Sequence, residues 1–231
     1  EGTFNAAFVP SYSAELKKSK KNAEEFANQI FNILTVGLLI IVFLIEIFMP
    51  IFINLIAPGF SDDKSKLELA INLTRITFPF LFFISLASYF SAILNSHNKF
   101  AIASAAPIIL NVLLIIILLF GAKLGDQLVV QLAYGISIAG LLQLLLLYFF
   151  SKKNFSPKVS LKFNLNKKVK FFFKKLLPSI FSSGVTQINI LVGTIIASFQ
   201  AGAVSYLYYA DRVYQINLAV AGIAVGTVSL P

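Results

Sequence analysis

An arginine beside an aspartate lies within one of the most apolar stretches of this chain. Asp211 and Arg212 interrupt a largely apolar segment that begins at Ala203 and continues past Ala221. An ionised side chain at bilayer depth costs at least ~2.5–3.5 kcal/mol, so it normally faces a water-filled cavity or a partner. A guanidinium binds two phosphate oxygens at once through its planar fork of N–H donors. Arg212 therefore predicts a site for an anionic substrate, or alternatively a structural pair inside a helix bundle.

Several polar side chains share a helix face with Arg212. Ser205, Tyr208 and Gln215 lie at the i, i+3 and i+10 positions of a face that has Arg212 at i+7. Arg212 is about ten residues from the outer end of its segment, hence ~15 Å deep at ~1.5 Å per residue. We include Asp211 in the candidate substrate-binding set, although it points in a different direction and should not neutralise Arg212 directly. Polar residues of the preceding segment are expected to line the same cavity, namely Ser182, Ser183, Gln187 and Asn189.

Composition and segment length predict the elements that carry these residues. The chain is 58% hydrophobic and 13% charged, with a mean hydropathy of +0.83. A helix that crosses ~30 Å of hydrocarbon needs ~20 residues, and long apolar runs without alternation favour helices over a barrel. We therefore expect an all-α integral membrane bundle with six full spans and a truncated N-terminal helix. The spans are expected near Ile30–Ala57, Leu69–Asn95, Phe100–Ala122, Leu128–Phe150, Leu176–Phe199 and Ala203–Leu230.

The net charge of +9 is distributed according to the positive-inside rule. If the loops alternate between two sides, one side holds 14 of the 19 basic residues and the other holds three, with Arg75 and Arg212 inside spans. This asymmetry places the lysine-rich loops, of which Lys17–Glu25 is the first, in the cytoplasm and argues against nucleic acid as a partner. The chain has no cysteine and a single histidine, His97, in a loop. No enzyme signature or metal constellation is visible, so we expect a transporter without catalytic residues or cofactor, with an ion as a possible coupling partner.

The lysine-rich segment 151–175 is the main boundary in the chain. We expect a first lobe over 1–150 that is truncated at its start, a cytoplasmic linker with an interfacial segment over 151–175, and the start of a second lobe over 176–231. The alternation of lysines and phenylalanines in the linker is typical of a solvated loop with an interfacial anchor, or of a lipid-headgroup site. The chain opens Glu1-Gly2-Thr3 and ends on an apolar segment, so we expect it to be a piece of a longer protein.

The chain resembles the MurJ/MviN family of lipid II flippases, within the superfamily that includes MATE exporters and polysaccharide flippases. The resemblance covers essentially the whole chain. It rests on the segments Glu1–Pro10, Ala57–Phe60, Ile76–Pro79, Ser85–Ser88, Ala92–Asn95, Tyr208–Arg212 and Gly222–Pro231.

The resemblance implies a fold of fourteen spans in two lobes around a cationic cavity, of which this chain matches the second to eighth helices. It implies that Arg212 engages a lipid-linked diphosphate, that Ser205 matches a cavity serine, and that Glu1 matches an acidic residue of the second helix. The expected function is alternating-access flipping of undecaprenyl-diphosphate-linked peptidoglycan precursor, lipid II, across the bacterial inner membrane for cell-wall synthesis. The alternatives are a polysaccharide-lipid flippase, a MATE-type drug or cation exporter, and, from another class, a membrane scaffold or glycosyltransferase subunit.

Overall fold

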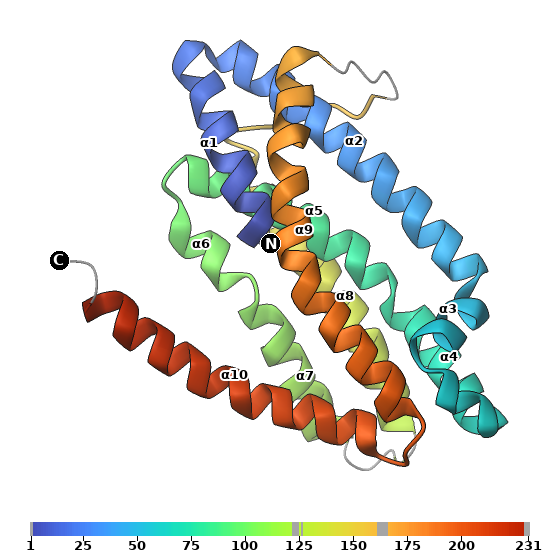
Figure 1. The fold of residues 1–231 in the computed structure, drawn as a ribbon. Coiled ribbons are helices and arrows are strands. Elements are labelled where there is room, and N and C mark those ends of the chain that lie inside the picture. The colour runs from blue at the N-terminus through green and yellow to red at the C-terminus, as the bar shows by residue number, and fades with distance from the viewer. Residues whose placement is uncertain (1, 122–124, 126, 161–165, 229–231) are drawn as a thin grey trace. The chain divides into compact units, whose positions relative to one another are not determined.

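A computed structural model describes the chain except for residues 1, 122–124, 126, 161–165 and 229–231, and its regular elements are all helical (Figure 1). The chain divides into two compact units. The first unit comprises Glu1–Met49 and Ile71–Gly184, and the second comprises Pro50–Ala70 and Val185–Pro231. The longest helix, α9, contributes to both units. The lobes expected over 1–150 and 176–231 follow a different division, and they stay a prediction.

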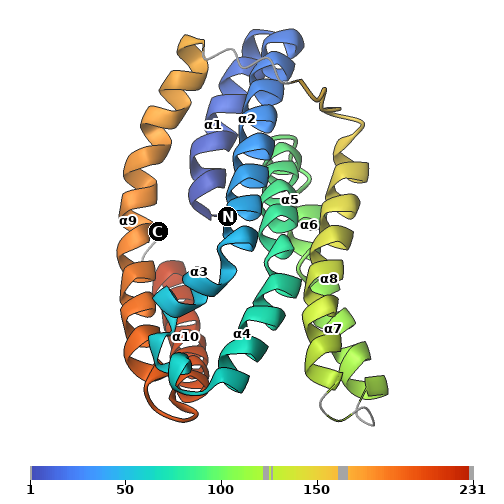
Figure 2. The same ribbon diagram turned by 90° about the vertical axis from the view of Figure 1, so that its right-hand side faces the viewer.

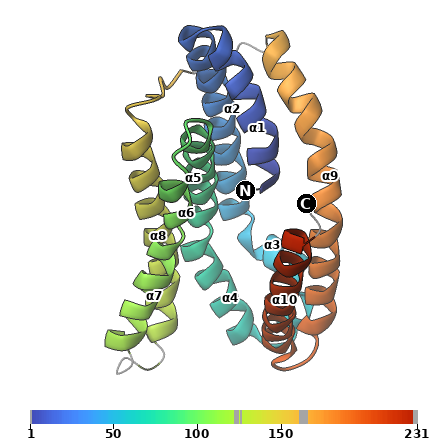
Figure 3. The ribbon, with the colours of Figure 1, turned by 90° about the vertical axis from the view of Figure 1, so that its left-hand side faces the viewer.

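The first unit is organised around helix α5 (Pro79–Ser96). Helix α5 packs against α1 (Gly2–Lys18), α2 (Lys20–Ile47) and, most extensively, α8 (Gln127–Ser151). Figure 2 shows α1, α2, α5 and α8 side by side, and Figure 3 shows the same neighbours from the opposite side, with α7 (Ile108–Gly121) on α8. The short helix α6 (Phe100–Ala105) joins α5 to α7, and the second half of α4 (Lys64–Thr77) leads into α5.

Stacked and edge-on aromatic rings form the core of this unit. The ring of Phe8 lies within 6.2 Å, centroid to centroid, of the rings of Tyr12, Phe26, Tyr89 and Phe172. Phe8 and Tyr89 are fully buried, and the Tyr89 hydroxyl donates a hydrogen bond of 2.9 Å to the carbonyl oxygen of Ala27. Buried tyrosine needs such a partner, whereas phenylalanine does not. The cluster therefore ties α1, α2, α5 and the first turns of α9 together.

The segment 17–25, which we expected to be a cytoplasmic loop, is helical except for one residue. Helix α1 ends at Lys18 and α2 begins at Lys20, with Ser19 alone between them. The Ser19 side chain caps α2 by accepting a hydrogen bond of 3.1 Å from the backbone N–H of Asn22, which satisfies one of the free donors at a helix start. The prediction of a loop was wrong because it rested on the lysines alone. Apolar residues recur on one face of this segment at helical spacing and are buried in the core, namely Ala23, Phe26, Ala27 and Ile30.

Proline positions set the remaining helix breaks. Pro79 is the first residue of α5, and Pro107 lies between α6 and α7, within a stretch that the sequence predicts as one span. Proline lacks a backbone N–H and favours the first turn of a helix, so it interrupts a helix with little cost at these points. The break at Pro107 divides this expected span into the helices α6 and α7. Pro10 lies inside α1.

Hydrogen bonds hold the described residues 151–160 of the linker against α2, although Lys152, Lys153 and Lys158 are exposed. Asn32 on α2 donates from its amide nitrogen to the Lys158 carbonyl oxygen at 3.2 Å and accepts from the Ser160 N–H at 3.0 Å. Asn28, one turn earlier, accepts from the Lys158 N–H at 2.7 Å, and Phe155 is buried. Residues 167–175 form the first turns of α9 (Lys167–Ser198), and their apolar face is also buried through Val169 and Phe172.

The second unit contains the second half of α9 and the helix α10 (Ala203–Val228), joined by a tight turn at Gly202. It also contains α3 (Met49–Ile56) apart from Met49, the 3₁₀ helix η1 (Pro58–Asp62) and the start of α4. Gly202 has a φ of +75°, a backbone conformation that glycine adopts without the steric penalty of a side chain.

The all-helical membrane bundle is confirmed in outline, but the count of six spans is not. Four segments in the described part of the chain are long and apolar enough to cross a membrane: Lys20–Ile47, Lys64–Ser96, Phe100–Gly121 and Gln127–Ser151. They correspond to the first four expected spans. The fifth falls on α9, where Gly184–Ser198 is a shorter apolar helix, and the sixth falls on α10, which is not described to the end of the expected span.

Candidate functional site

Helix α10 carries the polar stripe that the sequence predicts. The side chains of Ser205, Tyr208, Arg212 and Gln215 are all exposed, and Asp211 is half-buried. The neighbouring apolar side chains on α10 are exposed as well, including Tyr209 at 66% and Val213 at 61%. The stripe therefore faces outward from unit 2 beside apolar surface.

Three side chains hold the Arg212 guanidinium and its surroundings in place. The Cζ atom of Arg212 lies 4.9 Å from the centroid of the Tyr208 ring, a cation–π contact. Its Nη1 donates to Oε1 of Gln215 at 3.5 Å, and the Gln215 amide nitrogen donates to Oδ2 of Asp211 at 2.6 Å. Gln215 thus connects the arginine and the aspartate, which make no direct ion pair with each other in the described part of the chain.

This arrangement leaves most of the guanidinium available to a ligand. Arginine has five N–H donors, and Arg212 uses one of them in a long hydrogen bond to a neutral amide. No carboxylate among the described residues lies within ion-pair distance of it. A bidentate contact to two oxygens of a phosphate remains geometrically open. The expectation that Asp211 does not neutralise Arg212 directly is therefore confirmed.

A cavity of about 360 Å³ lies beside the stripe, between α10 and the second half of α9. Tyr208 and Asp211 line it from α10, and Asn189 and Thr194 line it from α9. Of the polar residues expected from the preceding segment, Asn189 therefore does share a cavity with the stripe. Gln187 is exposed and lies outside the lining, and the side chains of Ser182 and Ser183 lie outside the described residues. Thr194 was not predicted as a site residue. Its hydroxyl donates to the Ile190 carbonyl oxygen one turn earlier, as threonine does in many helices, so the sequence carries no signal that it lines a cavity.

The turn at Gly59 fixes the end of α9, from which α10 starts. The Gly59 N–H donates to the Ser198 hydroxyl at 3.0 Å, and that hydroxyl donates to the Ile195 carbonyl at 2.7 Å. A Cβ atom on Gly59 would lie 2.5 Å from backbone atoms of Ser198 and Phe199. Only glycine allows the two backbones to approach this closely. This contact gives a physical reason for the Ala57–Phe60 segment of the resemblance.

The remaining candidate residues are placed as follows. Glu1 lies outside the described residues. His97, expected in a loop, lies between α5 and α6, where its Nε2 is 3.3 Å from the Tyr12 hydroxyl. Burial, and then the charges of Lys99 and Lys20, lower the His97 pKa below its ordinary value. In the described part of the chain, no group of three or more histidine, cysteine or acidic side chains could hold a metal ion.

Four apolar helices in the described part of the chain are long enough to cross a membrane, which indicates a multi-pass membrane protein, and a polar, arginine-bearing stripe on a further helix is typical of a transporter. Comparison with known proteins specifies the family. The model of the lipid II flippase MurJ family matches residues 1–231, so the chain belongs to that family and the resemblance is confirmed.

The relatives are bacterial proteins of about twice this length. The chain is 39% identical over 233 residues to the probable lipid II flippase MurJ of Rickettsia prowazekii, with 100% of this chain and 45% of the relative covered. It is 38% identical over 237 residues to the corresponding protein of Rhizobium tropici, again over 100% of this chain and 44% of the relative. A solved structure of lipid II flippase MurJ in an inward closed conformation matches with a TM-score of 0.79 and 30% identity, covering 99% of this chain and 47% of the other. The chain thus spans a little under half the length of the relatives it matches.

Proposed function

We propose that the protein to which this chain belongs flips a lipid-linked diphosphate, the peptidoglycan precursor lipid II, across the bacterial inner membrane. The family membership supports this substrate, since the relatives carry the name of lipid II flippases. The movement is alternating access between two lobes, a common mechanism of multi-pass transporters with internal repeats. The proposed process involves no covalent chemistry and no cofactor.

The single observation that carries the proposal is the state of Arg212. Its guanidinium is exposed on an apolar helix, oriented by Tyr208 and Gln215, and without a carboxylate partner in the described residues. A structural arginine in a membrane would be paired, because an unpaired charge among apolar groups is costly. A diphosphate supplies the missing partner, with Ser205 and Glu1 as further contacts implied by the family resemblance. Asp211 and Gln215 position the guanidinium in this arrangement.

The test replaces Arg212 in the full-length protein and measures growth of a strain depleted of its own lipid II flippase. Arg212→Ala removes the contacts of the guanidinium to the diphosphate, and hydrogen bonds to charged groups contribute about 1.5–3 kcal/mol, equivalent to about 10- to 150-fold in binding. We expect loss of growth rescue. Arg212→Lys keeps the charge but loses the fork geometry, so it should rescue poorly. Arg75→Ala is the matched control, because Arg75 is also an exposed arginine on an apolar segment but lies outside the stripe.

The amount of folded protein separates the substrate site from a structural pair. Asp211 keeps its hydrogen bond from Gln215 when Arg212 is removed, so Arg212→Ala strands no acidic group in the described residues. Immunoblots should therefore show near-normal amounts of Arg212→Ala in the membrane. A large drop in folded protein would support the structural pair instead. Full growth rescue by Arg212→Ala would remove the support for a diphosphate site. If the unaltered full-length protein rescued only strains that lack a polysaccharide-lipid flippase or a drug exporter, those alternative substrates would be favoured.

A further inference from the structure

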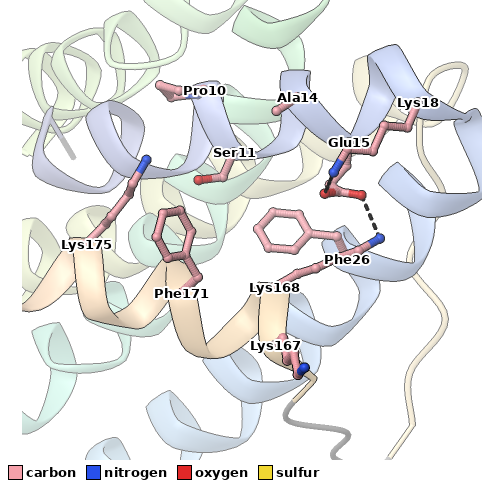
Figure 4. Close-up of a pocket in the computed structure, with 10 residues that line it drawn as sticks. All are labelled: Pro10, Ser11, Ala14, Glu15, Lys18, Phe26, Lys167, Lys168, Phe171 and Lys175. Carbon is pink, nitrogen blue, oxygen red and sulfur yellow. Dashed lines mark hydrogen bonds and ion pairs between the residues drawn. The ribbon is translucent and has the colours of Figure 1, made fainter.

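Unit 1 contains a second polar cleft that plays no part in the stripe on α10. The cleft has a volume of about 480 Å³ and lies between α1 and the first turns of α9. Figure 4 shows Glu15 and Lys18 lining it from α1, and Lys168, Phe171 and Lys175 lining it from α9. Most of its charged side chains are lysines, with Glu15 as the one carboxylate in the lining.

Glu15 fixes the positions of two of these lysines. Its side chain is only 8% exposed, and each of its two carboxylate oxygens accepts a hydrogen bond of 2.7 Å, one from Lys18 and one from Lys168. Burial raises the Glu15 pKa, but the hydrogen bonds and charges of Lys168 and Lys18 outweigh this effect, so the pKa lies below its ordinary value. Each ammonium has three N–H donors and spends one on Glu15. Two donors per lysine therefore remain, held in place by a buried carboxylate.

Lys175 adds a third ammonium without a carboxylate partner. Its Nζ lies 4.6 Å from the centroid of the Phe171 ring, and Figure 4 shows the side chain reaching from α9 toward α1. No acidic side chain among the described residues pairs with it. With Lys18, Lys168 and Lys175 against the single carboxylate of Glu15, the lining of the cleft has an excess of positive charge. By contrast, Lys167 lines the rim and points away from α1.

The order of residues along α9 places the cleft at a membrane surface. The lysines end at Lys175, and the next exposed side chains are apolar: Leu177 at 52%, Ile180 at 49% and Phe181 at 75%. The helix advances ~1.5 Å per residue, so Lys168 and Lys175 lie within about 14 Å of this apolar surface. The headgroup region extends only ~5–8 Å beyond the hydrocarbon on each side, so Lys175, ~3 Å from Leu177 along the helix axis, lies inside it, and Lys168 lies on its aqueous side. Phe171 itself is exposed at 56% on the cleft wall, where it offers apolar surface next to the ammonium groups.

We propose that this cleft binds the headgroup of an anionic phospholipid, with Lys175 at the phosphate, Lys18 and Lys168 toward the aqueous end of the headgroup, and Phe171 against the headgroup carbons. Fixed cations beside exposed apolar surface match the phosphate and glycerol region of a lipid, whereas a soluble anion would leave the apolar wall without a partner. Basic pockets between helices at a membrane surface are a recognised way to hold anionic headgroups. The bound lipid would connect α1 to α9 next to the Glu15–Lys168 ion pair.

The test measures lipid binding to the detergent-solubilised full-length protein by native mass spectrometry. The probes are short-chain phosphatidylglycerol, phosphatidylcholine of the same chain length, and inorganic phosphate. We expect selective binding of phosphatidylglycerol. Lys175→Gln should weaken that binding about fivefold, the equivalent of ~1 kcal/mol, which is what one basic side chain contributes near an anionic surface. Lys174→Gln is the matched control, because it removes the same charge from the neighbouring position, which does not line the cleft.

Lys175→Arg should retain binding, because it keeps the cation, and it also serves as the informative variant if Lys175→Gln fails to fold. Equal losses from Lys174→Gln and Lys175→Gln would indicate diffuse surface charge and overturn the proposal. Binding of phosphatidylcholine as tight as that of phosphatidylglycerol would also overturn it, as would saturation of the site by inorganic phosphate alone. None of these readouts requires flipping activity, so the result is independent of the function proposed above.

Discussion

The contact between Gly59 and the end of α9 makes a sharp prediction about stability. In Gly59→Ala, the new methyl group would lie 2.5 Å from the carbonyl carbon and oxygen of Ser198 and from the nitrogen of Phe199. These are backbone atoms, which cannot rotate away as a side chain could. Overpacking of this kind costs about 1–3 kcal/mol. The shift would also weaken the hydrogen bond from Gly59 to the Ser198 hydroxyl, which contributes about 1 kcal/mol.

A smaller effect acts in the opposite direction. Alanine has less backbone freedom than glycine in the unfolded chain, which stabilises the folded state by about 0.4–1 kcal/mol. The net expectation for Gly59→Ala is therefore destabilisation by about 1–3 kcal/mol. The measurement is the thermal unfolding temperature of the full-length protein in detergent, followed by intrinsic fluorescence and by loss of the monodisperse peak on size-exclusion chromatography.

Gly37→Ala is the matched control, with the opposite expected sign. Gly37 lies inside α2, and no atom would come within 4 Å of a Cβ built on it. Alanine should therefore increase the free energy of unfolding by about 0.5–1 kcal/mol and so raise the unfolding temperature. If Gly59→Ala were as stable as the unaltered protein while Gly37→Ala behaved as expected, the close backbone contact at Gly59 would be refuted.

Three further predictions concern the first unit and the topology. A cysteine placed at Ser156 should resist impermeant thiol reagents in intact cells and one at Ser65 should react, and the reverse labelling would overturn the orientation derived from the lysine asymmetry. Glu15→Gln should destabilise the protein by about 1–3 kcal/mol. This is less than the ~3–5 kcal/mol for breaking a fully buried pair, because the partly exposed Lys168 ammonium can bind water instead. An unchanged free energy of unfolding would contradict the buried ion pair. Folding lowers the Glu15 pKa, so the ionised carboxylate stabilises the folded protein fully above its unfolded pKa, and this stabilisation is lost as the pH falls through the folded pKa. Glu15→Gln should therefore make the unfolding free energy less dependent on pH in the acidic range. Asn32→Ala removes two hydrogen bonds to the linker and should speed tryptic cleavage within 151–165 in inside-out vesicles, whereas an unchanged rate would show that the linker is held elsewhere.

The helices could be predicted from the sequence because the signal for them is local. The span expected over Leu128–Phe150 became α8 (Gln127–Ser151), within one residue at each end. In hydrocarbon every backbone N–H and C=O must be satisfied within the segment, so a long apolar run has essentially one conformation available. The polar stripe on α10 followed for the same reason, since helical periodicity alone brings Ser205, Tyr208, Arg212 and Gln215 to one face.

Where prediction failed, side-chain contacts between distant segments decided the outcome. Lys17–Glu25 looks like a charged loop, yet it is helical except at Ser19, because Ala23 and the following Phe26 and Ala27 pack into the core. The linker keeps exposed lysines, as expected of a solvated loop, and only the structure shows that Asn28 and Asn32 bind its backbone across 126 or more residues of sequence. The sequence around these asparagines does not reveal the contacts, because an asparagine on a helix face looks the same in the sequence whether it faces water or another segment.

The sequence by itself determined the class of this protein, its helical segments and the family to which it belongs, since apolar length, charge asymmetry and the Arg212 stripe are properties of the linear chain. Only the tertiary structure decided how the charges are paired. Glu15 could have been another surface carboxylate, but the packing of α1 against α9 buries it between Lys18 and Lys168. Pairing depends on distances of a few ångströms between side chains, and those distances exist only once the helices have packed.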